Sequence, residues 1–289
     1  MERFYSIAGS VIRVTGPDGQ MDCDDSNLRP YECPPAQWDH WLEFSVVQKV
    51  SPPIGELVYA EDSKRIYIHG DTHLRYEGTV SNAPTDAYIR IERQGKHSRV
   101  EAVSRFLAGY ITAKLVLNAM EAEHMIALRQ GVILHAAYIR WNEEAILFTA
   151  PSGTGKSTQA ELWGCLRGAE LVNGDRVAVM TGSDKIMACG IPFCGSSGVN
   201  ENVTVPVRAV VYLSQGKTTE IHRLSGVQAF RRIWEGCSVN VWNREDLSAC
   251  TRTVMEIVSR VPVFHLSCTP DESAVFALEQ QILDNTGNV

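Results

Sequence analysis

The chain contains, at residues 150–158, the run Ala150-Pro151-Ser152-Gly153-Thr154-Gly155-Lys156-Ser157-Thr158. Small and Gly-rich residues let successive backbone N–H groups turn around an anion, which bulky side chains would prevent. A short apolar segment precedes this run, and residues 156–166 have the composition of a helix that would begin at the anion. The pattern predicts a phosphate-binding loop; the alternative is an ordinary Gly-rich turn between a strand and a helix.

Each residue type in this loop suits a nucleotide phosphate site. Lys156 supplies a positive charge for the β- and γ-phosphates, and the Ser157 hydroxyl is a hard oxygen ligand of the kind that Mg²⁺ prefers. The strict pattern has Gly at its first position, where Ala150 makes the mildest change. We therefore expect ATP and Mg²⁺ to bind here. The predicted phosphate-binding residues are Ser152, Gly153, Thr154, Gly155, Lys156, Ser157 and Thr158.

Two residues outside the loop are candidates for catalysis, together with Lys156. Phosphoryl transfer needs a carboxylate for the metal and a group that orients or deprotonates the acceptor. Asp175 follows the apolar segment after the loop helix, and it is the candidate for both tasks; the alternative is a turn residue in an Asn-Gly-Asp corner. His135 lies in an apolar strand before the loop, where a histidine can instead be a satisfied core residue. The Gly-rich segment 195–198 either closes over the site or is a plain loop.

The motifs LHAAYIRWNEEAILFTAPSGTGKST and GAELVNGDRVAV resemble the catalytic domain of HPr kinase/phosphorylase. They are still more similar to stand-alone HPr-kinase-like proteins of peptide-tailoring clusters, including lasso-peptide kinases. The resemblance is specific over residues 132–179 and looser to the C-terminus. It implies a P-loop fold similar to phosphoenolpyruvate carboxykinase and ATP-dependent phosphorylation of a hydroxyl, typically of serine. It also implies phosphate and Mg²⁺ roles for Lys156 and Ser157, and it matches His135 to the histidine ahead of the family's loop.

The chain departs from this family at two points. The family has two adjacent aspartates after the third strand, one proposed as base and one as metal partner, whereas this chain has Gly174 and Asp175. The assignment of the base therefore stays open between Asp175 and His135. The E-x-R-G signature of HPr kinases is also missing, so neither HPr as substrate nor phosphorylase activity is implied.

Composition limits the classes of partner and the compartment. The net charge of −7 argues against broad binding of nucleic acid or of anionic membranes. The N-terminus has no secretory pattern, and Lys114 interrupts the most apolar helical region. The eight cysteines form no C-x-x-C pair, although Cys23 and Cys33 flank a polar loop and could share a metal or a disulfide. We expect a cytoplasmic protein with reduced thiols and no membrane partner.

Hydrophobic patterning predicts an α/β fold with two domains. Residues 1–98 alternate as β-strands do and form a smaller, β-rich N-terminal domain, with acceptor recognition as its expected role. A helical pattern follows over residues 103–130, and strands then alternate with helices to the C-terminus. Residues 99–289 are accordingly predicted to form the HPr-kinase-like P-loop domain.

These features together predict a kinase that transfers the γ-phosphoryl group of ATP to a hydroxyl, with Mg²⁺ as cofactor. The acceptor is a Ser or Thr of a peptide or protein, or a small alcohol. A nucleotide-binding regulator or scaffold without transfer is the alternative, and Gly174 favours it. A simple ATPase coupled to motion is disfavoured, because no strand ends in Asp-Glu and no arginine finger is evident. The sequence leaves open the nucleobase and the oligomeric state, including a homo-oligomer.

Overall fold

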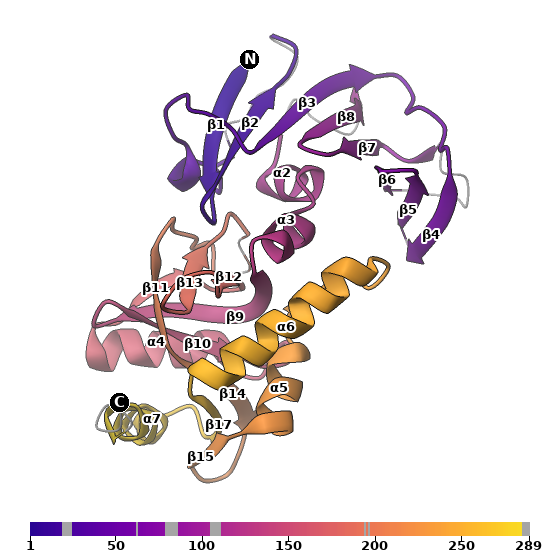
Figure 1. The fold of residues 1–289 in the computed structure, drawn as a ribbon. Helices are drawn as coiled ribbons and strands as arrows, with labels where there is room; N and C mark the ends of the chain where they lie inside the picture. Colours follow the sequence, from indigo (N-terminus) through magenta and orange to yellow (C-terminus); the bar gives the residue numbers. More distant parts are fainter. Residues whose placement is uncertain are drawn as a thin grey trace. The chain divides into compact units, whose positions relative to one another are not determined.

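The computed structural model describes residues 1–18, 25–61, 63–78, 86–104, 111–193, 195 and 197–284. It divides into two compact units, Met1–Ala122 and Glu123–Val289 (Figure 1). Each unit is built on one β-sheet, so the protein has a mixed α/β architecture with two sheets.

The first unit contains an eight-stranded sheet in the order β1-β2-β3-β8-β7-β6-β5-β4. Its strands are β1 (Glu2–Ile7), β2 (Ser10–Thr15), β3 (His40–Val47), β4 (Glu56–Glu61), β5 (Lys64–His69), β6 (Thr72–Glu77), β7 (Ile89–Gln94) and β8 (His97–Val103). The 3₁₀-helix η1 (Arg29–Tyr31) and the helix α2 (Ala113–Ala119) complete this unit. β3 pairs in parallel with β2 and β8, and the other neighbours are antiparallel. The β-rich character predicted for residues 1–98 is seen here, with β4–β5 and β7–β8 among the antiparallel pairs.

The observed division differs from the predicted boundary between residues 98 and 99. That boundary would cut β8, which pairs with β3 on one side and β7 on the other. The single helical pattern predicted over 103–130 also differs from the observed elements. β8 extends to Val103, and two shorter helices, α2 and α3 (Ala122–Leu128), follow it. Residues 105–110 lie outside the described part of the chain. A left-handed residue, Glu121 (φ 50°), separates the two helices. Its buried carboxylate accepts hydrogen bonds from His73 and Arg93, which stabilises this break.

The second unit contains a nine-stranded sheet covered by helices. Its strands are β9 (Gly131–Trp141), β10 (Glu144–Thr149), β11 (Glu170–Asn173), β12 (Arg176–Met180), β13 (Met187–Gly190), β14 (Thr204–Gln215), β15 (Glu220–Leu224), β16 (Cys237–Ser238) and β17 (Val263–Cys268). Its helices beyond α3 are α4 (Lys156–Arg167), α5 (Gly226–Trp234), α6 (Arg244–Arg260) and α7 (Glu272–Asp284). β10 pairs with β9 and with β14, and β14 also pairs with β13, so the pairing of β10, β9, β12, β13 and β14 closes a ring.

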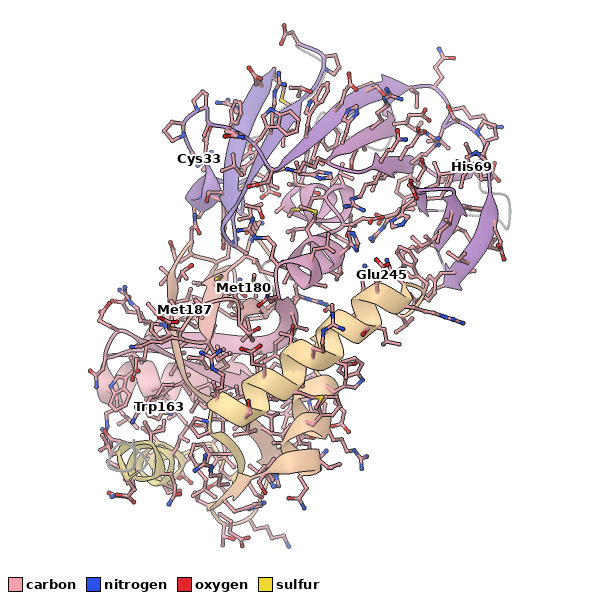
Figure 2. All side chains as sticks on the ribbon, viewed as in Figure 1. Cys33, His69, Trp163, Met180, Met187 and Glu245 are labelled. Carbon is pink, nitrogen blue, oxygen red and sulfur yellow. The ribbon has the colours of Figure 1, made fainter. Side chains whose placement is uncertain are left out.

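Two apolar cores lie in this second unit. Side chains of α5 and α6 contribute to one core, and side chains of α4 and α7 contribute to the other. Trp163 of α4, labelled in Figure 2, is fully buried and packs edge-on against Trp141 at a ring-centroid distance of 5.1 Å. This packing fixes α4 and therefore the position of its first turn. Across the described residues, no helix combines the length and the apolar character that crossing a membrane requires.

Candidate phosphate site

The predicted loop runs from the end of β10 to the start of α4. Gly153 has φ 77° and Gly155, the N-cap of α4, has φ 120°, conformations that favour glycine. A Cβ at either glycine would meet nothing within 4 Å, so the backbone conformation, not crowding, requires glycine here. No described side chain caps α4, which leaves its first N–H groups facing the loop. The strand, loop and helix predicted from the sequence are confirmed.

Lys156 folds over this loop. Its side chain is 8% exposed, and Nζ donates hydrogen bonds to the carbonyl oxygens of Ala150 (3.0 Å) and Pro151 (3.4 Å). Burial lowers the pKa of Lys156, and the negative charge of Asp175 opposes that shift. Ser157 and Thr158 are exposed at the start of α4. The loop and the first turn of α4 therefore bring one cation and two exposed hydroxyls together in the sequence 156–158.

A groove of about 380 Å³ lies along the loop. One wall is the loop itself, and the other wall is the end of β14. The lining residues are Pro151, Ser152, Gly153, Thr154, Tyr212, Leu213, Ser214 and Gln215. The volume falls within the range typical of small-molecule sites.

His135 and Asp175 lie together, as a catalytic pair requires. His135 Nε2 is 3.4 Å from Asp175 Oδ1, and the two side chains are 32% and 26% exposed. The hydrogen bond from His135 lowers the pKa of Asp175, and the charges of His135, Arg176 and Lys156 add to this effect against burial. The carboxylate is therefore ionised at neutral pH.

Asn173 fixes the corner that carries Asp175. Its fully buried side chain accepts hydrogen bonds from the backbone N–H groups of Asp175 (2.8 Å) and Arg176 (3.0 Å). Its amide nitrogen donates to the carbonyl oxygens of Ile191 (3.1 Å) and Phe193 (2.9 Å). Asp175 thus lies in a turn, which is the alternative predicted for the Asn-Gly-Asp corner, and that turn holds its side chain beside His135.

Gly195 and Ser197, from the Gly-rich segment 195–198, lie against this corner, whereas residues 194 and 196 lie outside the described part of the chain. A Cβ at Gly195 would be 2.8 Å from Asp175 Cβ, and a Cβ at Gly174 would be 2.3 Å from Ser197 Oγ. Both glycines are therefore required by close contact. A carboxylate at position 174 would fit only if Ser197 moved.

Arg176 is a site residue that the sequence analysis missed. Its Nε is 3.5 Å from Asp175 Oδ2, its guanidinium donates to Ser238 Oγ, and its guanidinium carbon lies 4.4 Å from the centroid of the Phe193 ring. Cation–π contact and the hydrogen bond hold this cation beside the carboxylate. Ser238 is distant in sequence, so only the position of an arginine directly after Asp175 could have indicated this role.

The sheet brings these groups to one edge. Thr149, the last residue before the loop, pairs with Ala136 on β9 and with Tyr212 on β14. His135 pairs with Arg176 on β12. The ends of β10 and β14 are parallel, and ligands commonly bind beyond the carboxyl ends of such strands.

The donor set fits Mg²⁺ bound together with a nucleotide. Ser157 offers an exposed hydroxyl and Asp175 an ionised carboxylate, and Mg²⁺ usually takes one or two carboxylates plus substrate phosphates. Among the described residues, no group of three or more His, Cys, Asp or Glu side chains is arranged to hold a metal alone.

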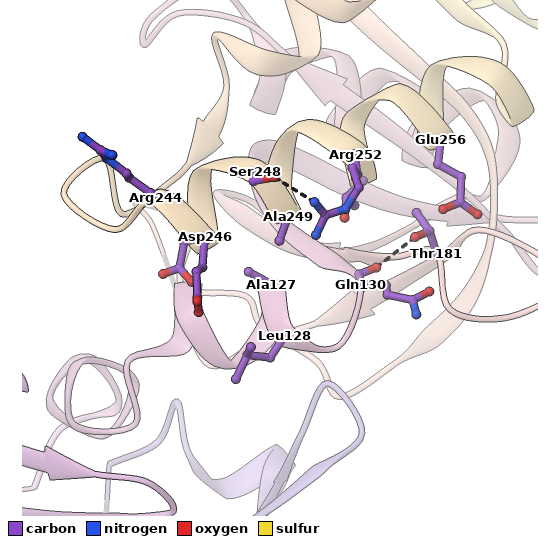
Figure 3. A pocket seen from close by; sticks show the side chains of 12 residues that line it. Ala127, Leu128, Gln130, Thr181, Arg244, Asp246, Ser248, Ala249, Arg252 and Glu256 are labelled. Carbon is purple, nitrogen blue, oxygen red and sulfur yellow. Dashed lines mark hydrogen bonds between the residues drawn. The ribbon is translucent and has the colours of Figure 1, made fainter. Parts of the chain in front are cut away.

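A larger cavity, of about 750 Å³, lies beside α6 in the second unit (Figure 3). Its lining comprises Ala127, Leu128, Gln130, Thr181, Arg244, Glu245, Asp246, Ser248, Ala249, Arg252, Thr253 and Glu256. Arg252 donates a hydrogen bond to Ser248 within the helix, and the Asp246 carboxylate is paired with His124. Acidic and basic side chains are interspersed here, and the phosphate loop does not line it. This cavity is not the phosphate site.

Comparison with known proteins adds little to this geometry. No family model matches the chain, and no curated protein matches it. The structure of the HPr(Ser) kinase/phosphatase from Coxiella burnetii is similar over 53% of this chain and 89% of that chain, with 12% sequence identity and a TM-score of 0.30. A TM-score this low supports no conclusion about the fold or the function of this chain.

Proposed function

We propose that this protein is a kinase that uses ATP and Mg²⁺ to phosphorylate a hydroxyl, through a P-loop domain similar to that of phosphoenolpyruvate carboxykinase and of HPr kinases. The acceptor is a Ser or Thr of a peptide or protein, or a small alcohol, and the cytoplasm is the proposed compartment. One observation carries the proposal: an uncapped helix with a buried lysine and the His135–Asp175 pair share one edge of the sheet.

Each residue has a task in this reaction. The loop N–H groups and Lys156 bind phosphate oxygens, which neutralises charge and orients the γ-phosphoryl group. Ser157 and Asp175 would hold Mg²⁺, which when bound neutralises further phosphate charge. The lowered pKa of Asp175 makes its carboxylate a weak base. Histidine is the commonest general base, so the position of His135 beside Asp175 supports His135 as acceptor of the hydroxyl proton and Asp175 as the group that orients His135 and binds the metal.

The first unit is the proposed site of acceptor recognition. β4 lies at an edge of its sheet, and Leu57 on this strand is 47% exposed. The other edge strand, β1, is partly covered, because Tyr5 forms a bridge with Glu32. An extended peptide can add to an open sheet edge through backbone hydrogen bonds. β4 is therefore the proposed docking strand for a peptide acceptor.

A nucleotide-binding regulator without transfer is the second candidate. It is favoured by Gly174, because Ser197 fills the space beside it and the corner carries only one carboxylate. Such a protein would bind ATP and leave every acceptor unmodified.

Two measurements on the purified full chain test the proposal. Saturation with Mg²⁺ and ATP at a hundred times Kd should stabilise the fold by about 2.7 kcal/mol, read as a rise in melting temperature. Mass spectrometry of candidate acceptors should then show an added phosphate that is absent with Lys156→Ala and retained with Lys185→Ala, which changes an exposed lysine away from the loop. An unchanged melting temperature would remove the nucleotide site, and binding without any phosphorylated acceptor would favour the regulator.

A further inference from the structure

The groove beside the phosphate loop has a second wall whose chemistry the phosphate site does not use. Tyr212, Ser214 and Gln215, at the end of β14, line it opposite residues 151–154. We infer that this wall binds the nucleoside part of the nucleotide, with the base stacked on the Tyr212 ring and the ribose beside Ser214. This inference rests on the proposed phosphate site and extends it.

The order of the strands places this wall on the side of β10 that faces away from His135. β10, which leads into the loop, pairs with β9 on one side and with β14 on the other. His135 lies on β9, and Tyr212 lies on β14 directly opposite the last residue of β10. A nucleotide whose γ-phosphate faces His135 must extend its nucleoside end away from that pair. Across the loop, that direction leads to the groove beside β14.

The Tyr212 ring is held in place before any ligand binds. The Arg232 guanidinium carbon lies 4.4 Å from the ring centroid, and Arg232 donates a hydrogen bond to the Tyr212 hydroxyl (3.4 Å). Arg232 is itself held by Glu235, at 3.1 Å. A ring that is already ordered loses little entropy when a base stacks on it, so its contacts contribute more fully to affinity.

Ser214 is oriented by a neighbouring histidine. Its Oγ lies 2.8 Å from His265 Nε2, and the His265 ring packs edge-on against His222 at 4.9 Å. Burial lowers the pKa of His265, and the nearby His222 and Arg232 lower it further, so that the imidazole stays neutral. A neutral imidazole has one donor and one acceptor nitrogen and can orient the hydroxyl. The pair thus places a directed polar group where a ribose hydroxyl would lie.

The inference is tested by comparing two probes on the full chain: ADP, and methyl diphosphate, which keeps the phosphates and lacks the nucleoside. Calorimetric titration of the wild-type protein should show ADP binding about 5- to 150-fold more tightly than methyl diphosphate, which is the contribution of base stacking on an aromatic side chain. Tyr212→Ala should weaken ADP binding by about tenfold and leave methyl diphosphate unchanged, since the loop contacts remain. Tyr212→Phe, which keeps the ring, should retain ADP affinity.

The outcomes separate this inference from the proposed function. If the wild-type protein binds neither probe, the phosphate site itself is wrong. If it binds both with equal affinity, the nucleoside has no subsite here, and this result needs no variant. Equal weakening of both probes by Tyr212→Ala, or ADP affinity unaffected by it, would likewise overturn the stacking role of Tyr212.

Discussion

The substitution Asp175→Asn isolates the charge at the centre of the site. Asparagine keeps the size and shape of the side chain and removes the negative charge that faces His135 (3.4 Å) and Arg176 (3.5 Å). The loop glycines and the hydrogen bonds from Lys156 Nζ to the carbonyl oxygens of Ala150 and Pro151 do not involve this carboxylate. ADP affinity measured without Mg²⁺ should therefore change by less than about tenfold, or about 1.4 kcal/mol.

The rate of phosphoryl transfer should respond to Asp175→Asn far more strongly than the ADP affinity does. Asparagine cannot hold the imidazole of His135 in the orientation that an ionised carboxylate imposes, and it is a poor ligand for Mg²⁺. Turnover should fall by about 10²–10⁴-fold, the range found when a general base or its orienting carboxylate is lost. The Mg²⁺ concentration needed for half-maximal rate should also rise. Stability should change little, because an ion pair of a partly exposed side chain contributes about 0.2–1 kcal/mol.

The assay is steady-state transfer to an identified acceptor over a Mg²⁺ titration. Asp184→Asn, at an exposed turn, is the matched control and should behave as the wild-type protein. His135→Ala should lose as much turnover with an unchanged Mg²⁺ requirement. Near-normal turnover of Asp175→Asn at ordinary Mg²⁺ would refute the role of Asp175 in transfer.

Three further predictions concern the loop, the corner and the first sheet. Gly155→Ala forces alanine to φ 120°, which should cost about 1–3 kcal/mol of unfolding free energy in chemical denaturation and weaken ADP binding. Gly174→Ala places a Cβ 2.3 Å from Ser197 Oγ and should destabilise the fold by about 1–3 kcal/mol, most of which Ser197→Gly in the same chain should restore; no recovery would mean that another contact excludes alanine. Leu57→Lys on β4 should raise KM for a peptide acceptor and leave KM for ATP unchanged, and unaltered acceptor kinetics would dissociate this strand from recognition.

The parts of the site that could be predicted are those encoded locally. The strand, loop and helix around Lys156 are contiguous, so the hydrophobic pattern and the glycines specify them together. Asp175 was predictable from its position after an apolar strand. A local signal also marks the start of α6, where the Asn243 side chain accepts hydrogen bonds from two backbone N–H groups of the first turn.

The parts that could not be predicted depend on contacts between distant residues. Arg176 meets Ser238, and Tyr212 meets His265, only because the sheet aligns their strands. The end of the first unit was misplaced because an alternating strand, β8, runs directly into a segment whose spacing also suits a helix. Only pairing with β3 and β7 shows that β8 belongs to the first sheet. Hydrophobic periodicity describes one segment of the chain at a time, so it does not show which distant strands pair with one another.

A single carboxylate at the corner has a consequence for how the site assembles. Asp175 already faces His135 and Arg176, and the charge of Lys156 also reaches it, so a divalent cation must compete with these positive groups for one side chain. Mg²⁺ loses its water reluctantly and needs several oxygen ligands, which one carboxylate and one serine do not supply. In the proposed kinase, nucleotide phosphates would provide the missing oxygens and, by binding the loop and Lys156, would draw that lysine's charge away from Asp175. Metal and nucleotide should therefore bind together, with affinity for the metal set by the nucleotide already held in the loop.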